Sequence, residues 1–290
     1  MSISMDLIKQ LREETGAGMT DCKNALIESN GDIEKARRIL LAKGAAKAVK
    51  KLDRLTKEGV ISIKNNGSKA VMIELACETD FVARNEKFIG LAKNISEFLF
   101  EQNFSSVEEA LKLSYNGKDL QTYINENISI FGENIKLSRA ISLEVEKDTQ
   151  VIFDYLHFNN RVGVLVLVEF EKPFSENQEE KKEFGNKTVF QIASMKPLYV
   201  DLSSVPPEEI EEQKKMAFEQ AKSEGKPDHI AQKIAEGKVN KIFEDSVLFE
   251  QTFYDDSLKI PKFKDYMNFV SSKIGEKILV RKFVRFEISK

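Results

Sequence analysis

The sequence is poor in the residues from which disulfide frameworks and most protein metal centres are built. It has two cysteines, Cys22 and Cys77, two histidines, His157 and His229, and no tryptophan among 290 residues. These four residues do not have the Cys/His spacing of a zinc site. Two distant cysteines also cannot form the disulfide network of a small secreted domain. We therefore expect a cytoplasmic protein, in a reducing environment, with no metal or cofactor of its own.

The common catalytic motifs are missing as well. The chain contains no G-x-S-x-G, no H-E-x-x-H and no cysteine in the context of a nucleophile. The segment Gly16-Ala17-Gly18 lacks the third glycine and the preceding strand of a dinucleotide-binding fingerprint, and no phosphate-binding loop ending in Gly-Lys-Ser/Thr is present. The sequence therefore predicts a protein that is not an enzyme.

Neither an excess of positive charge nor a long apolar run is found. The net charge is -3, from 44 basic and 47 acidic side chains, whereas general nucleic-acid binding requires surplus Lys and Arg to neutralise phosphates. No stretch reaches the roughly 18 apolar residues of a membrane span, and the N-terminus lacks the apolar run of a signal peptide. We expect neither membrane association nor specific nucleic-acid binding.

The N-terminal 44 residues have the pattern of three short helices. Gly16 can end the first, Thr20 or Asp21 can cap the second, and Asp32 can cap the third after the Asn30-Gly31 pair. One apolar face is expected on each helix, formed by Met5, Ile8 and Leu11, by Cys22, Ala25 and Leu26, and by Ile33, Ala36, Ile39 and Leu40.

A basic stretch follows, from residue 43 to residue 57. It can be a solvated helix that joins two domains, or a surface that contacts RNA or an acidic protein. Its cations are Lys43, Lys47, Lys50, Lys51, Arg54 and Lys57, against a single acidic residue, Asp53.

The remainder of the chain contains two copies of one unit. FGENIKLSRAISLEV at residues 131–145 and IGEKILVRKFVRFEI at residues 274–288 are similar endings. Each copy also begins with a hairpin, whose turn lies at Asn65-Asn66-Gly67 in the first and at Asn159-Asn160 in the second. We predict an α+β fold made of two related subdomains, each an antiparallel sheet with helices.

The second copy is longer because it contains an insertion. A charged helix is expected after Val205-Pro206-Pro207, a break at Gly225-Lys226-Pro227, and a second helix after it. This pattern predicts a projecting helical hairpin. The expected domains are then residues 1–55 (bundle and basic linker), 56–145 (first subdomain) and 146–290 (second subdomain, with the hairpin at about 205–245).

One stretch joins a strand to a helix and is a candidate site. Val71, Ile73, Leu75 and Cys77 alternate with Met72, Glu74, Ala76 and Glu78, which predicts a half-buried strand, and a helical pattern begins at about Asn85. Asp80 and Phe81 should therefore lie on the connection, where functional residues are common. The alternative is that Phe81 packs into the core, as most large aromatic residues do.

Several of these segments together resemble one known family. TDFVARNEKF at residues 79–88, LREETGAGMTDCKNAL at 11–26 and NGDIEKARRIL at 30–40 are similar to elongation factor Ts, and so are RVGVLVLVEF at 161–170, VRFEIS at 284–289 and the ending at 131–145. The resemblance covers nearly the whole chain in the family's order. It implies a ubiquitin-associated type of N-terminal bundle, a coiled-coil arm, and possible self-association through the core or the arm.

The resemblance also implies a function, namely nucleotide exchange on the translational GTPase elongation factor Tu. Such a factor acts on the GDP and Mg²⁺ bound to its partner and has no catalytic chemistry of its own. Many members of the family continue after the last strand with a further helical module that touches the GTPase. The sequence ends two residues after Ile288, so we expect this contact to be missing or replaced.

Individual partner-binding residues can be carried over by position. Phe81 matches the aromatic residue that disturbs the segment supporting Mg²⁺, Asp80 would orient the turn or pair with the partner, and Thr79 and Val82 would shape it. His157 matches a strand-end histidine of the family; it can be exposed, or satisfied by its neighbours. The other residues that match partner-contacting positions are Phe131 and Gly132 beside the Phe81 turn, and Arg12, Met19 and Lys23 in the N-terminal bundle.

Overall fold

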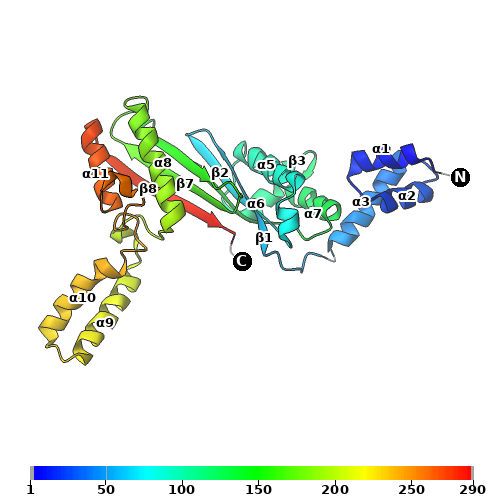
Figure 1. Ribbon diagram of the computed structural model, residues 1–290. Coiled ribbons are helices and arrows are strands. Elements are labelled where there is room, and N and C mark those ends of the chain that lie inside the picture. Colours follow the sequence, from blue (N-terminus) through cyan, green and yellow to red (C-terminus); the bar gives the residue numbers. More distant parts are fainter. Residues whose placement is uncertain (1–2, 50, 289–290) are drawn as a thin grey trace.

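The molecule is elongated, with a helical bundle at one end and a helical hairpin projecting near the other (Figure 1). The computed structural model describes residues 3–49 and 51–288, except for the side chains of residues 45–49 and 240. Antiparallel sheets and helices alternate along the chain, which confirms the predicted α+β fold class.

Three helices form the N-terminal bundle, α1 (Met5–Thr15), α2 (Met19–Glu28) and α3 (Ile33–Val49). Gly16 ends α1 with φ 68°, a left-handed conformation that glycine adopts without strain. The side chain of Asp32 accepts a hydrogen bond from the Lys35 amide at 3.0 Å, so its predicted role as a cap is confirmed. The predicted cap of α2 is wrong: the residue before this helix is Gly18, and no side chain caps it.

The first sheet-and-helix unit has a three-stranded antiparallel sheet in the order β1-β2-β5. Helix α5 packs on β1 and β2, and its apolar face contributes Phe88, Leu91 and Ile95 to the core. The elements are β1 (Glu58–Asn65), β2 (Lys69–Cys77), α4 (Asp80–Ala83), α5 (Glu86–Phe100), α6 (Val107–Lys112), β3 (Ser114–Tyr115), β4 (Lys118–Asp119), α7 (Leu120–Phe131) and β5 (Lys136–Glu144).

The second unit repeats this plan in the order β6-β7-β8. The pairing register shifts between Glu74 and Leu75 in β2, and correspondingly between Leu167 and Val168 in β7, so the two sheets share an irregularity as well as an order. The elements are β6 (Gln150–Leu156), β7 (Val162–Phe170), α8 (Gln178–Met195), a short 3-10 turn η2 (Asp256–Leu258), α11 (Phe263–Ile274) and β8 (Ile278–Glu287).

The two sheets pack face to face, with helices on the outer face of each (Figure 1). This arrangement corrects the expected half-buried strand, because β2 is buried on both faces except at Lys69 and Glu74. Met72 packs against residues of the second sheet such as Leu165, whereas the alternate positions of β2 face the helices. The sheets approach closely at Gly163, where a Cβ atom would lie 2.6 Å from Cγ2 of Ile61.

The predicted helical hairpin is present and projects from the second unit (Figure 1). It consists of α9 (Pro207–Ser223) and α10 (Asp228–Ile242), and a short 3-10 turn, η1 (Leu202–Ser204), precedes it. Small side chains allow the two helices to approach closely along the buried seam, which contains Ala217, Ala221, Ala231 and Ala235. A separate cluster, defined by Val205, Val239, Phe243 and Val247, closes the base of the hairpin.

Candidate functional site

Phe81 is the most prominent feature of the strand-to-helix join, since 85% of its surface is exposed. Residues Asp80–Ala83 form the short helix α4, so Asp80 and Phe81 belong to a helical turn and not to an irregular connection as expected. The Thr79 hydroxyl caps this turn by accepting a hydrogen bond from the Val82 amide, and Asp80 pairs with Arg84 at 3.2 Å. The alternative that Phe81 packs into the core is wrong.

Glu133, which follows the end of α7, anchors the Phe81 turn. Its carboxylate accepts hydrogen bonds from the backbone amides of Glu78 and Thr79 at 3.0 and 2.9 Å, and from the Thr79 hydroxyl at 2.5 Å. Bonds to an ionised acceptor are stronger than those between neutral groups. Val82 packs against the core on the inner side of the turn. The exposed ring therefore projects from a turn that is held on two sides.

Phe131 and Gly132 lie beside this turn, directly before Glu133. Gly132 is exposed and ends α7 in the left-handed conformation, at φ 78°. Phe131 is half-buried, and its ring meets that of Phe88 edge to face at 5.5 Å between centroids. Only part of Phe131 is thus exposed, whereas a Cβ atom on Gly132 would meet no atom within 4 Å, although the Gly132 carbonyl oxygen accepts a hydrogen bond from Lys51.

His157 belongs to the second unit but lies at the same end of the first sheet as the Phe81 turn. The Ile61 amide of β1 donates to the Asn160 carbonyl oxygen at 2.7 Å. Arg161 of the same β6–β7 turn pairs with Glu58, the β1 residue opposite Cys77 at the end of β2. Nδ1 of His157 is 2.6 Å from the Tyr155 hydroxyl, and the centroids of the His157 and Phe158 rings are 4.5 Å apart. His157 is half-buried and satisfied by its neighbour, while Phe158 is 89% exposed.

The remaining predicted site residues lie on the N-terminal bundle, away from the Phe81 turn. Arg12 and Lys23 are exposed, and Met19 is half-buried against the bundle core. They do not join the Phe81 turn in a common pocket. Arg12 lies on α1 and both Met19 and Lys23 lie on α2, whereas Phe81 lies on α4, so the bundle residues and the Phe81 turn form two separate surfaces.

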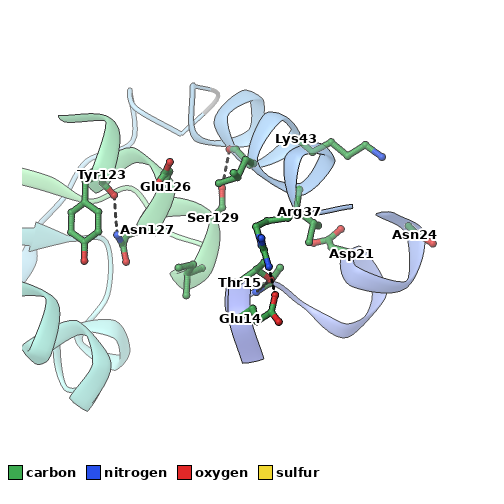
Figure 2. A pocket seen from close by; sticks show the side chains of 15 residues that line it. Glu14, Thr15, Asp21, Asn24, Arg37, Lys43, Tyr123, Glu126, Asn127 and Ser129 are labelled. Carbon is green, nitrogen blue, oxygen red and sulfur yellow. Dashed lines mark hydrogen bonds and ion pairs between the residues drawn. The ribbon is translucent and has the colours of Figure 1, made fainter. Parts of the chain in front are cut away.

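A cleft of about 380 Å³ separates the bundle from α7 (Figure 2). Side chains of Glu14 and Arg37 approach it from the bundle, and Tyr123 and Ser129 from α7. The Ser129 hydroxyl donates to the Gly44 carbonyl oxygen at 2.8 Å and ties α7 to α3. The predicted site residues, all within the described part of the chain, do not line this cleft, which we regard as the joint between the bundle and the first unit.

The two thiols are not suited to chemistry. Cys77 lies below the Phe81 turn, donates a hydrogen bond to the Thr79 carbonyl oxygen at 3.3 Å, and has its pKa raised to about 12, mainly by burial. Burial also raises the pKa of Cys22. Thiols with raised pKa values are poor nucleophiles at neutral pH. Over residues 3–49 and 51–288 the structure contains no group of three or more His, Cys, Asp or Glu side chains placed to hold a metal ion.

Cations of the basic stretch have partners within the molecule. Lys43 pairs with Glu28, Lys51 donates to the Gly132 carbonyl oxygen, and Arg54 lies 3.5 Å from Glu78. Lys50 and the side chain of Lys47 lie outside the described residues. This stretch therefore contributes to joining the bundle to the first unit. No helix in the described part of the chain is long and apolar enough to cross a membrane.

Comparison with known proteins identifies the family. A family model described as elongation factor TS matches residues 78–263, beginning at the Phe81 turn. Elongation factor Ts of Aquifex aeolicus (strain VF5) is 42% identical over 298 residues, which cover 99% of this chain and 98% of that protein. The chain belongs to the elongation factor Ts family.

A second relative shows the same extent of similarity. Elongation factor Ts of Hydrogenobaculum sp. (strain Y04AAS1) is 41% identical over 293 residues, with 99% of each chain covered. Membership of this family assigns the chain a role in translation elongation.

Sequence reasoning missed one residue of the site. Glu133 was not assigned a role, although it holds the turn that carries Phe81. A signal was present, because the glutamate of FGEN at residues 131–134 is repeated in IGEK at residues 274–277. A residue kept in both copies of a repeat indicates a shared structural task.

Proposed function

We propose that the chain binds elongation factor Tu and accelerates the release of GDP by inserting the Phe81 ring between structural elements of the GTPase. The observation that carries this proposal is the 85% exposure of Phe81 on a turn held by Glu133 and capped by Thr79. An exposed aromatic ring on a fixed backbone binds a partner with little loss of conformational entropy. Family membership supplies the class of partner.

The energetics of this mechanism are reasonable. A factor that binds the nucleotide-free GTPase more tightly than the loaded one must weaken nucleotide binding by the same ratio. A thousandfold faster release corresponds to a barrier lower by about 4 kcal/mol. Burial of one Phe side chain is worth roughly 1.5–3 kcal/mol, so the ring supplies a large part and other contacts supply the rest. The ring would act by displacing the segment that supports Mg²⁺ in the GTPase.

The other contacts would come from two surfaces. Gly132 and the turn that contains His157 lie at the same end of the first sheet as Phe81, and would contact the GTPase around the inserted ring. On the bundle, Arg12, Met19 and Lys23 would dock on the GTPase domain. In this proposal the chain acts in the cytoplasm, carries no cofactor of its own, and has a hairpin that contributes to self-association or partner contact.

The test is the rate at which labelled GDP leaves purified elongation factor Tu. Wild type should accelerate release, and Phe81→Ala should reduce that acceleration by more than about tenfold, because the inserted ring is lost. Phe269→Ala is the matched control, since Phe269 is another exposed phenylalanine, 54% accessible, on the distant helix α11. Equal activity of wild type and Phe81→Ala would refute insertion of the ring, and no acceleration by wild type would refute the function.

A further inference from the structure

The internal repeat places a second glutamate in the role of Glu133. Glu276, at the matching position of the second copy, accepts a hydrogen bond from the Lys172 amide at 2.9 Å. The neighbouring contact is repeated too: Glu171 accepts from the Lys277 amide at 3.1 Å, as Glu78 accepts from the Asn134 amide at 2.7 Å. Each copy thus ties the end of its middle strand to the start of its last strand through two carboxylates.

This correspondence aligns Glu78-Thr79-Asp80-Phe81 with Glu171-Lys172-Pro173-Phe174. The aligned phenylalanines nevertheless have opposite environments. Phe81 is 85% exposed, whereas Phe174 is half-buried in the core of the second unit, with its ring 5.9 Å from that of Phe153. The pair of carboxylates that each copy uses to tie its middle strand to its last strand therefore does not decide whether the ring points outward.

What differs between the copies is what the glutamate binds. Glu276 pairs with Lys181 at 3.1 Å, and the Lys181 ammonium donates to the carbonyl oxygens of Lys172 and Pro173. Both side chains of this ion pair are fully buried. Glu133 instead binds the Thr79 hydroxyl, and that hydroxyl caps α4 by accepting from the Val82 amide. Only in the first copy, therefore, does the glutamate bind a side chain that caps a helical turn.

We propose that Glu133 is a positioning residue, whose carboxylate fixes the Thr79 cap and so holds Phe81 in the exposed orientation needed for insertion. This inference rests on the proposed function. The Thr79 hydroxyl has one proton, and donating it to Glu133 leaves a lone pair directed at the Val82 amide. Without the carboxylate, the hydroxyl can rotate away, and the amides of Glu78 and Thr79 lose their acceptor.

The first measurement is amide hydrogen exchange of residues 78–82, which does not depend on any activity. In Glu133→Ala, the amides of Thr79 and Val82 should exchange about tenfold faster or more than in wild type, because each loses its acceptor or its cap. Glu133→Gln keeps the size of the side chain but removes its charge, and should give a smaller increase. Unchanged exchange in both variants would overturn the proposal.

Glu109→Ala is the matched control. The Glu109 carboxylate likewise accepts from a backbone amide and a hydroxyl, those of Ser105, at 2.9 and 2.8 Å, but at the start of α6. This variant should speed amide exchange near Ser105 and leave GDP release from elongation factor Tu unchanged. A fall in GDP release equal to that of Glu133→Ala would show that loss of any such contact suffices, and would contradict a specific positioning role.

The second measurement is a double-mutant cycle on GDP release. Glu133→Ala should lower the maximal rate by about tenfold and change the half-saturating concentration by less than about twofold, because the docking surfaces are intact. In a Phe81→Ala background, Glu133→Ala should cause no further loss. Additive losses would overturn the proposal. If wild type does not accelerate release, the proposed function fails, and amide exchange still decides whether Glu133 holds the turn.

Discussion

The two aligned phenylalanines provide a stability experiment whose outcome follows from their environments. The perturbation is truncation of each ring, Phe81→Ala and Phe174→Ala. Both residues follow the middle strand of their sheet. Two residues before each ring, a backbone amide donates to a glutamate carboxylate: Thr79 to Glu133 in the first copy, and Lys172 to Glu276 in the second. Because both rings follow equivalent strand ends, we expect the difference in stability between the variants to reflect mainly how far each ring is buried.

The expected magnitudes differ by several-fold. Phe81 is 85% exposed, so its truncation should change the free energy of unfolding by no more than about 0.5 kcal/mol. Truncation of a fully buried phenylalanine costs about 3–5 kcal/mol. Phe174 is half-buried, with its ring 5.9 Å from that of Phe153 and 6.2 Å from that of Phe170, so we expect about 2 kcal/mol. For a chain of 290 residues, that loss lowers Tm by about 3 °C.

The assay is urea and thermal unfolding of the two variants beside wild type, followed by circular dichroism. Phe81→Ala should overlay the wild-type curve, and Phe174→Ala should unfold at lower urea concentration and lower temperature. A loss of more than about 1 kcal/mol in Phe81→Ala would refute the reasoning, because a ring that is 85% exposed has little buried area to lose. Equal curves for both variants would show that Phe174 is also exposed in solution.

Two further predictions concern the sheets. Gly163→Ala should destabilise the protein by about 1–3 kcal/mol in urea unfolding, because its Cβ would lie 2.6 Å from Ile61 in the facing sheet; a neutral result would show that the sheets can separate without cost. Hydrogen bonds from Arg281 and Gln150 lower the pKa of Glu169 to about 2. A lowered pKa contributes stability above the ordinary value of 4.5, which is lost as pH falls toward 2, so Glu169→Gln should reduce the fall in the urea midpoint over that range. The same acid sensitivity in wild type and variant would exclude Glu169 as its source.

The order of elements was predictable because each signal depends on residues close in sequence. Gly16 ends a helix, Asp32 caps the next, and the turn at Asn65-Asn66-Gly67 joins two strands, each through the conformational preference of one or two residues. The repeated endings at residues 131–145 and 274–288 likewise revealed the two related units. Local preference and repetition were sufficient for the α+β fold class and for the inserted hairpin.

The environment of the candidate site depended on residues far apart in the chain. Phe81 and Phe174 follow similar strands, yet only the folded structure brings Glu133 to the Thr79 cap in one copy and the buried Lys181 to Glu276 in the other. The two-sided burial of β2 has the same origin, because its second cover is the sheet formed after residue 150. The sequence alone determined where strands and helices lie and which family the chain resembles. The tertiary structure decided which aromatic ring faces the solvent, because exposure is set by packing partners that no local pattern specifies.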